Sequence, residues 1–211
     1  ISDYDRDVME LTIREVGHVT NAIFNKGIGD YLHIRGPYGN GFDVKDHYGK
    51  DLIIVTGGTG LAPVKYIINY FSDNIDKLNS FKLISGFKSS QEILFRDSFD
   101  KWKENIDVCL TIDSPEEGWK GNTGFVTEHI SKLDIKDIQN THVIMVGPPP
   151  MLRFSAMELA KLGIPNEQIW VSFERKMSCG IGKCGHCKIG STYVCQEGPV
   201  FRYDKAVQLI D

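Results

Sequence analysis

The sequence predicts an α/β protein built on a five-stranded, doubly wound parallel sheet, with antiparallel β structure before the sheet and a cysteine-rich loop after it. Three observations support this fold class. Apolar runs alternate with helical patterns across residues 50–174, which is typical of strands and helices that follow each other. Residues 1–48 hold short alternating segments separated by turns, and residues 175–203 are rich in Gly and Cys without a periodic apolar pattern.

Composition narrows the classes of protein that fit. The 211 residues are 41% hydrophobic and 25% charged, which is ordinary for a globular protein of one to three small domains. The net charge of −4 argues against nucleic-acid binding, and no apolar run of about 18 residues predicts membrane insertion. Four of the five cysteines lie close together near one end, which is a poor disulfide framework. We therefore expect a metal site and a reducing, cytoplasmic location, with Cys109 a buried strand thiol.

Residues 1–48 read as short strands. Residues 9–14 alternate apolar and polar side chains, and Gly17 ends that pattern. Residues 31–35 alternate again and are followed by a turn cluster at 36–41. This is too little β structure to close a barrel. We therefore expect a truncated antiparallel barrel whose other strands precede Ile1.

Residues 49–174 read as the parallel sheet and its helices. Residues 52–55 form a continuous apolar run, as expected for a strand covered on both faces. Leu61, Val64 and Ile68 then fall on one face of a helix. The other elements predicted for this region are a strand at 81–87, a helix around 92–105, a strand at 108–113, a short helix near 127–132, a strand at 142–147, a helix at 149–162 and a strand at 168–174.

The cysteine-rich loop carries the most specific motif in the chain. Its cysteines follow C-x4-C-x2-C with a fourth Cys after seven more residues: Cys179, Cys184, Cys187 and Cys195. This is the plant-type [2Fe–2S] spacing, and the interleaved glycines permit the tight turns that a cluster loop needs. The alternative is a structural zinc site with four Cys ligands, although zinc sites usually show paired C-x2-C units and this loop has one. We predict the cluster, with His186 outside the ligand set.

Two glycine-bearing turns predict a nucleotide site. The first is Gly57, Gly58, Thr59 and Gly60, directly after an apolar strand and before a helix. A helix N-terminus with free N–H groups favours a pyrophosphate, and the alternative is a plain tight turn. The second is Gly147 and Pro148, where the alternative is that the prolines only begin a helix. In a doubly wound sheet the first and fourth strands are commonly neighbours, so both turns should face one crevice.

A third candidate is the segment 13–20. Arg14 could clamp a phosphate, and Thr20 could donate a hydrogen bond to one. The alternative is that Arg14 lies on a solvated strand face.

Together these residues resemble the ferredoxin-NADP reductase superfamily, and within it the electron-transfer flavoproteins with a C-terminal [2Fe–2S] loop. The resemblance is closest to the electron-transfer flavoprotein of anaerobic sulfite reductases. Gamma subunits of cytoplasmic hydrogenases or sulfhydrogenases and electron-transfer subunits of dihydroorotate dehydrogenase are the related alternatives. The stretches that carry the resemblance are 1–4, 38–41, 57–65, 146–149, 168–171, 182–188 and 193–195.

The resemblance implies three domains and a role for each motif. Residues 1–48 would be the C-terminal part of an FAD-binding β-barrel, residues 49–174 the NAD(P)-binding domain and residues 175–211 the cluster-binding domain. The Gly57–Gly60 loop would hold the NADH pyrophosphate, with Gly147 and Pro148 near the nicotinamide. The family's main flavin motif would end at about Ile1. The residues here that would hold FAD are Ile13, Arg14, Glu15, Gly17, Val19 and Thr20.

The resemblance also implies a function. The chain would pass electrons from NADH through FAD and a [2Fe–2S] cluster to partners, expected to be an iron–sulfur subunit and a sirohaem catalytic subunit. No catalytic side chain is expected, because the cofactors carry the reaction. NADPH is an alternative donor, since Lys88-Ser89-Ser90 could meet a 2′-phosphate, although a solvated loop is the other interpretation. A zinc-stapled, nucleotide-sensing module is the alternative from another class.

Overall fold

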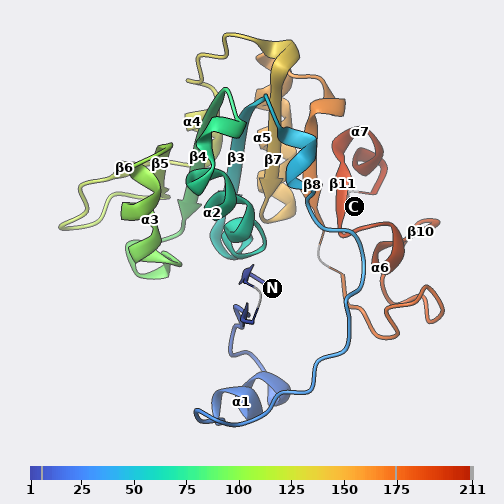
Figure 1. Ribbon diagram of the computed structural model, residues 1–211. Coiled ribbons are helices and arrows are strands. Elements are labelled where there is room, and N and C mark those ends of the chain that lie inside the picture. Colours follow the sequence, from blue (N-terminus) through green and yellow to red (C-terminus); the bar gives the residue numbers. More distant parts are fainter. Residues whose placement is uncertain (6, 174, 210–211) are drawn as a thin grey trace.

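The computed structural model describes residues 1–5, 7–173 and 175–209 (Figure 1). The five predicted strands are all present and parallel: β3 (Asp51–Gly57), β4 (Ser80–Phe87), β5 (Asp107–Ile112), β7 (Thr141–Val146) and β8 (Ile169–Ser172). Two short strands extend the sheet, namely β6 (Asn122–Thr123), parallel to β5, and β11 (Val200–Arg202), antiparallel to β8. The strand order is β11-β8-β7-β3-β4-β5-β6, so the sheet is mostly parallel, as predicted.

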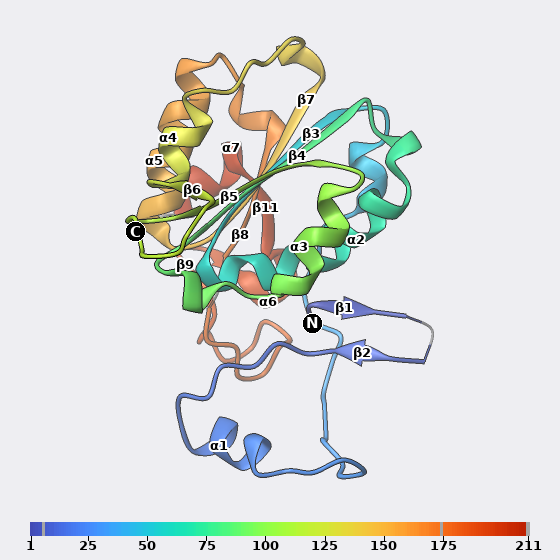
Figure 2. The ribbon, with the colours of Figure 1, turned by 90° about the vertical axis from the view of Figure 1, so that its left-hand side faces the viewer.

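Helices cover both faces of the sheet. One face carries η2 (Gly58–Val64), α2 (Lys65–Asp73) and α3 (Arg96–Lys103), and the other carries α4 (Val126–Ile130), α5 (Pro149–Lys161) and α7 (Tyr203–Ala206). Figure 2 shows these two layers on either side of the sheet. Leu52 and Ile54 belong to one buried cluster and Ile53 and Val55 to the other, because successive side chains of a strand point to opposite faces. This explains the continuous apolar run of β3.

Short 3-10 helices form further connections between the described elements. They are η1 (Val44–His47), η3 (Ile75–Lys77), η4 (Ser90–Glu92), η5 (Ile138–Asn140), η6 (Asn166–Gln168) and η7 (Val207–Leu209). The helix predicted around 92–105 begins later, at Arg96, because η4 and a left-handed Phe95 with φ 52° precede it. No helix among the described residues combines the length and apolarity needed to span a bilayer.

The register of β3 and β7 positions the candidate nucleotide site. These two strands are neighbours, and Thr56 of β3 pairs with Val146 of β7. The first and fourth long strands therefore lie side by side, as the sequence predicted. Their carboxyl ends bring Gly57 and Gly147 to the same edge of the sheet.

The strand predictions for residues 1–48 are largely wrong. The described part of this region has β1 (Asp3–Tyr4) and β2 (Met9–Glu10), an antiparallel pair of two residues each, and α1 (His18–Phe24). Residues 11–14 and 31–35 are not strands. A strand needs a neighbouring strand to satisfy its backbone, and within the described residues none pairs with these segments. Alternation alone therefore does not produce a strand here.

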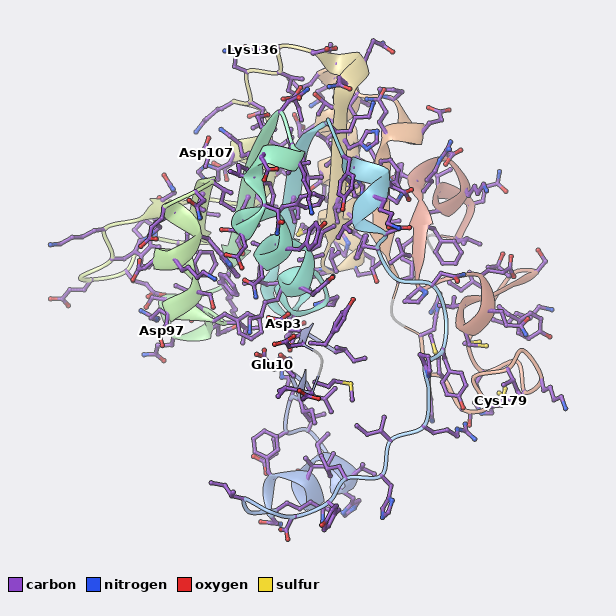
Figure 3. The ribbon with its side chains drawn as sticks, viewed as in Figure 1. Asp3, Glu10, Asp97, Asp107, Lys136 and Cys179 are labelled. Carbon is purple, nitrogen blue, oxygen red and sulfur yellow. The ribbon has the colours of Figure 1, made fainter. Side chains whose placement is uncertain are left out.

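Three polar and aromatic contacts tie the β1–β2 pair to helix α2. The Nζ atom of Lys65, a residue that is only 8% exposed, lies 2.7 and 2.6 Å from the two Glu10 carboxylate oxygens. Asn69 donates a 2.6 Å hydrogen bond to Asp3. The ring of Tyr4 stacks on Tyr66 with centroids 4.4 Å apart. Figure 3 shows Asp3 and Glu10 below α2.

The cysteine-rich segment has its own small core. Its elements are β9 (Lys188–Ile189), β10 (Thr192–Tyr193) and α6 (Val194–Glu197). Two of the cysteines, Cys187 and Cys195, pack with Ile189 and Val194. Asn40 forms two hydrogen bonds to this end of the chain. Its backbone N–H donates to Gly198 O at 2.6 Å, and its side-chain amide donates to Gln196 O at 2.9 Å.

A histidine pair, with His47 buried and His142 partly buried, lies at the opposite end of the sheet from the glycine turns. His47 Nδ1 and His142 Nδ1 are 3.2 Å apart, and both rings pack against Trp170. Burial lowers the pKa of each histidine to about 4; the charge of His142 adds to this at His47, and the charge of Lys50 adds to it at His142. Both rings are therefore neutral in the folded protein at pH 7.

We expect this pair to make the fold sensitive to acid. Unfolding returns each ring to its ordinary pKa of 6.5, so the unfolded chain binds more protons between pH 6.5 and 4. Above pH 6.5 the pair costs the folded state no stability. The free energy of unfolding then falls as the pH drops from 6.5 towards 4, by about 3 kcal/mol for His47. The urea midpoint of His47→Leu/His142→Leu should vary less between pH 7 and 5 than that of the wild type. Replacing the exposed His33 by Gln should leave the pH dependence unchanged, and equal slopes in all three proteins would contradict this expectation.

Candidate functional site

The Gly57–Gly60 loop lies in tight contact with the end of strand β7. A Cβ atom on Gly60 would stand 2.2 Å from the carbonyl oxygen of Val146 and 3.0 Å from Cα of Gly147. A Cβ on Gly57 would meet the sulfur of Met151 at 2.4 Å. Gly58 has φ 53°, a left-handed conformation that glycine adopts without strain. Only glycines allow the loop and the β7 turn to approach this closely.

The two glycine turns line one crevice at the carboxyl edge of the sheet. One cavity, of about 640 Å³, is lined by Gly57, Gly58, Thr59 and Pro148 among others. A neighbouring cavity, of about 300 Å³, is lined by Gly57, Thr59, Gly60, Gly147 and Pro148 among others. These volumes lie at or within the usual range for small-molecule sites. The structure therefore brings all six predicted nucleotide residues together.

The larger of these cavities is lined by three charged side chains. Lys88 is the residue that the sequence indicated for a 2′-phosphate, whereas Asp113 and Glu92 were not predicted. Burial raises the pKa of the Asp113 carboxyl, the negative charge of Glu92 raises it further, and Lys88 opposes the shift. Asp113 follows β5 at the same carboxyl edge that bears the glycine turns, so the rule for parallel sheets could have found it.

A third cavity, of about 860 Å³, adjoins the smaller of these two cavities. It is lined by aromatic side chains from both ends of the chain, among them Tyr4, Phe42, Tyr66 and Phe173. Ser172, Phe173 and Arg175 also line the 300 Å³ cavity, so the two spaces share a wall. Met177, two residues before the first loop cysteine, lines the third cavity as well.

The residues predicted to hold FAD do not gather at this aromatic cavity. Arg14 lines the 640 Å³ nucleotide cavity instead. The Thr20 hydroxyl already accepts the N–H groups of Val16 and Gly17, at 2.9 and 3.0 Å, which begins helix α1. The others line none of the three cavities: Ile13, Glu15, Gly17, Val19 and Thr20. Their role in holding FAD therefore stays a prediction.

The cysteine loop directs backbone N–H groups at sulfur. Cys179 Sγ lies 3.5 Å from the N–H nitrogen of Ile181 and 3.4 Å from those of Lys183 and Cys184. These N–H groups lower the pKa of the Cys179 thiol, and the N–H of Ile181 has the largest effect. Gly182 N approaches Cys195 Sγ at 3.3 Å. The three interleaved glycines have φ between 69 and 78°, the left-handed conformation expected for them: Gly180, Gly182 and Gly185.

The four thiols lie close enough to act on one another. Cys184 influences the pKa of the Cys179 thiol, and both Cys187 and Cys179 raise the pKa of the Cys195 thiol. No three His, Cys, Asp or Glu side chains in the described parts of the chain form a group arranged to hold a metal ion. The preference for a [2Fe–2S] cluster over zinc therefore depends on the spacing of the cysteines and on the N–H groups directed at sulfur.

Arg35 forms hydrogen bonds to the start of the cysteine loop, although 143 positions separate it from Ser178 in the sequence. Its guanidinium donates to the carbonyl oxygens of Ser178 at 2.9 Å and Cys179 at 3.0 Å. The same group lies 5.5 Å from the ring centroid of Tyr38, and that ring faces Gly180 so closely that a Cβ there would be 2.9 Å away. No short motif joins residue 35 to residue 179, so no sequence pattern indicated this contact.

The two domain types expected from this geometry are matched in known families. Residues 54–156 match the oxidoreductase NAD-binding domain, and residues 174–207 match the iron-sulfur cluster binding domain of dihydroorotate dehydrogenase B. The fold and site thus define an NAD-dependent electron-transfer oxidoreductase.

Relatives of the whole chain narrow this class to one family. The sulfhydrogenase 2 gamma subunit of Pyrococcus furiosus is 35% identical over 94% of this chain and 74% of its own length. The probable dihydroorotate dehydrogenase B (NAD(+)) electron transfer subunit of the same organism is 34% identical over 90% of this chain and 69% of its own length. The chain belongs to this family of electron-transfer subunits, which join a ferredoxin-NADP reductase-like NAD-binding domain to an iron–sulfur domain.

A solved structure supports the same fold. The NADH-dependent reduced ferredoxin-NADP oxidoreductase, described for flavin-based electron bifurcation, superposes with a TM-score of 0.70 at 26% identity, over 94% of this chain and 70% of that chain. The cytochrome b5 reductase domain of Ulva prolifera nitrate reductase, 22% identical, superposes over 74% of this chain and 64% of its own, with a TM-score of 0.60. It shares the fold.

Proposed function

We propose that this chain carries electrons from NADH, through FAD and a [2Fe–2S] cluster, to a separate catalytic subunit. The observation that carries the proposal is the row of adjoining cavities. The glycine-turn crevice shares Ser172, Phe173 and Arg175 with the aromatic cavity, which reaches Met177 beside the cysteine loop. Bound FAD would supply the conversion of a hydride into single electrons, and a cluster held by the four cysteines would supply one-electron transfer.

Each region of the chain has a proposed role. Residues 49–174 bind NADH, with the Gly57–Gly60 loop at the pyrophosphate and the Gly147–Pro148 turn near the nicotinamide. Residues 175–211 bind the cluster through Cys179, Cys184, Cys187 and Cys195. Residues 1–48 belong to the FAD-binding part, in which Tyr4 and Phe42 face the proposed position of the flavin ring.

The related subunits favour a hydrogenase or a dihydroorotate dehydrogenase as the catalytic partner. This differs from the partner expected from sequence motifs, an anaerobic sulfite reductase with a sirohaem subunit. The seven-residue gap before Cys195 suits both the sulfhydrogenase and the sulfite reductase subunits, so sulfite reductase is kept as the second candidate. Purifying the native complex anaerobically and assaying it with hydrogen, dihydroorotate and sulfite separates these partners.

Anaerobic titration with NADH tests the proposed path. Protein loaded with FAD, iron and sulfide should show the electron paramagnetic resonance signal of a reduced [2Fe–2S] cluster after NADH is added. Protein loaded with the cluster but without FAD should show no such signal. A colourless protein that holds one zinc ion per chain would overturn the proposal and favour the zinc-stapled module.

We expect NADH to be preferred over NADPH. The 2′-phosphate of NADPH brings up to two further negative charges into a cavity lined by Asp113 and Glu92, and Lys88 offsets only part of this repulsion. Asp113→Asn should raise kcat/KM for NADPH relative to NADH by about tenfold, or about 1.4 kcal/mol. Asp134→Asn, outside the residues that line the cavity, is the control. A wild-type preference for NADPH would show that Lys88 dominates instead.

A further inference from the structure

Asn40 and Gly41 form the single Asn-Gly sequence in the chain, within the turn cluster at 36–41. Asparagine loses its side-chain amide most readily before glycine, because glycine has no Cβ to hinder the attack of its nitrogen on the asparagine side chain. Both residues are exposed, so water can reach them. The sequence therefore makes Asn40 the asparagine of this chain that is most open to deamidation.

Residues 196–200 fix both the backbone and the side chain of Asn40. The Asn40 N–H donates to Gly198 O at 2.6 Å, and the Asn40 carbonyl oxygen accepts the Val200 N–H at 3.3 Å. The side-chain amide donates to Gln196 O at 2.9 Å. Residue 40 also forms a parallel β-bridge to this segment, and Figure 1 shows the light blue chain around residue 40 beside α6. We call these four interactions the Asn40 contact.

We propose that Asn40 is a deamidation site and that opening of the Asn40 contact sets its rate. In the reaction the Gly41 nitrogen bonds to Cγ of Asn40 and gives up its proton, and the side-chain amide leaves as ammonia. Water then opens the resulting cyclic imide to give aspartate or isoaspartate. Ring closure needs the Asn40 side chain to fold back onto the Gly41 nitrogen, whereas the contact holds it towards Gln196. The chain must therefore open locally before it can react.

The product of the reaction cannot restore the contact. At neutral pH the new carboxylate has no proton to donate, so residue 40 would place an oxygen against Gln196 O. Isoaspartate would also add a carbon to the backbone between the two groups that bond to Gly198 and Val200. Gln196 lies in α6, next to Cys195. Deamidation should therefore loosen the segment that carries one proposed cluster ligand, a consequence that rests on the function proposed above.

Gly39 supplies a way to open the Asn40 contact by mutation. It has φ 75°, and a Cβ there would stand 2.3 Å from Gly198 O, a backbone atom. Gly39→Ala should therefore separate the two segments, and we expect Asn40 in this folded variant to deamidate at least tenfold faster than in the wild type. Gly27→Ala, where a Cβ meets nothing within 4 Å, should leave the rate unchanged. Peptide mapping by mass spectrometry at mildly alkaline pH measures these rates.

Two further comparisons make this test specific. Asn79, which precedes the small residue Ser80 outside the contact, should deamidate at one rate in the wild type and both variants. Gly41→Ala should slow the reaction at Asn40, because the new methyl group hinders the attack and meets nothing else within 4 Å. Equal rates at Asn40 in the wild type and Gly39→Ala would overturn the proposal. If Gly39→Ala does not fold, the wild type unfolded in urea replaces it, and equal rates with and without urea lead to the same conclusion.

The effect of the product on the cysteine segment is tested with Asn40→Asp. In cluster-loaded protein this variant should release iron to a chelator about tenfold faster than the wild type, because the lost donor leaves Gln196 O unpaired. Asn79→Asp adds the same charge outside the contact and should release iron at the wild-type rate. Equal release from the two variants would reject this effect. If the wild type binds no iron, the proposed function fails, and the deamidation rates still decide the role of Asn40.

Discussion

Replacing Cys184 by serine should remove the [2Fe–2S] cluster and stop one-electron transfer. Cys184 lies close to Cys179 in the loop, and a serine hydroxyl is a much weaker iron ligand than a thiolate, so one iron would lose one of its two cysteine ligands. The loop around it has few other sources of stability, because the small core described for this segment contains four buried residues. Loss of the cluster should therefore also loosen residues 178–186. The expected readouts are loss of visible absorption, iron and sulfide, and at least a 100-fold lower rate with cytochromes.

Cys109→Ser is the matched control for this substitution. Cys109 lies in β5, far along the chain from the loop, and burial raises the pKa of its thiol. This variant should keep its iron, sulfide and visible spectrum. NADH binding should survive in both variants, because Cys184 lines none of the nucleotide cavities. A Cys184→Ser protein with full iron content and an unchanged visible spectrum would show that the cysteine is not a ligand.

Replacing Gly60 by alanine should have the second largest effect, on NADH binding. The new methyl group would stand 2.2 Å from Val146 O and 2.6 Å from Val146 C, which are backbone atoms of a central strand. Neither can rotate away, so the loop must move off the end of β7 and widen the crevice. Overpacking of this kind typically costs about 1–3 kcal/mol, and we expect the dissociation constant for NADH to rise by about 100-fold.

The Gly60→Ala result is interpretable only if the rest of the protein stays intact. The visible spectrum of the cluster and its iron content should match the wild type, since the loop lies outside the cysteine segment. Gly27→Ala is the control, because a Cβ at residue 27 would meet nothing within 4 Å and its φ is not positive. Wild-type NADH affinity in Gly60→Ala would disprove the close contact that the structure places there.

The parallel sheet was predictable because its signals are local. The apolar run of β3 and the periodic helix after it need no partner to be recognised, and the β3–β7 neighbourhood follows from the strand order of doubly wound sheets. The cysteine spacing and its glycines were equally local, and the structure has those glycines in left-handed conformations. Local signals thus indicated both the nucleotide crevice and the cysteine loop.

The first 48 residues were not predictable in the same way. The alternation at 31–35 indicated a strand, but a strand depends on a neighbour that no local pattern reveals. The aromatic cavity has the same origin, since Tyr4, Tyr66 and Phe173 meet only through tertiary packing. Arg14 was expected at a flavin phosphate and lines the nucleotide cavity instead. Sequence spacing says little about contacts between distant segments.

The hydrogen bonds from Arg35 to the cysteine loop couple cluster binding to the packing of the chain around residue 35. Because Arg35 and Asn40 bond to the loop backbone at Ser178, Cys179 and Gln196, ordering the loop and ordering residues 35–40 stabilise each other. By reciprocity, a cluster that favours the ordered loop must also protect residues 35–40 by the same free energy. The rate of protease cleavage near residue 35 would then show whether the cluster is bound to the cysteine loop.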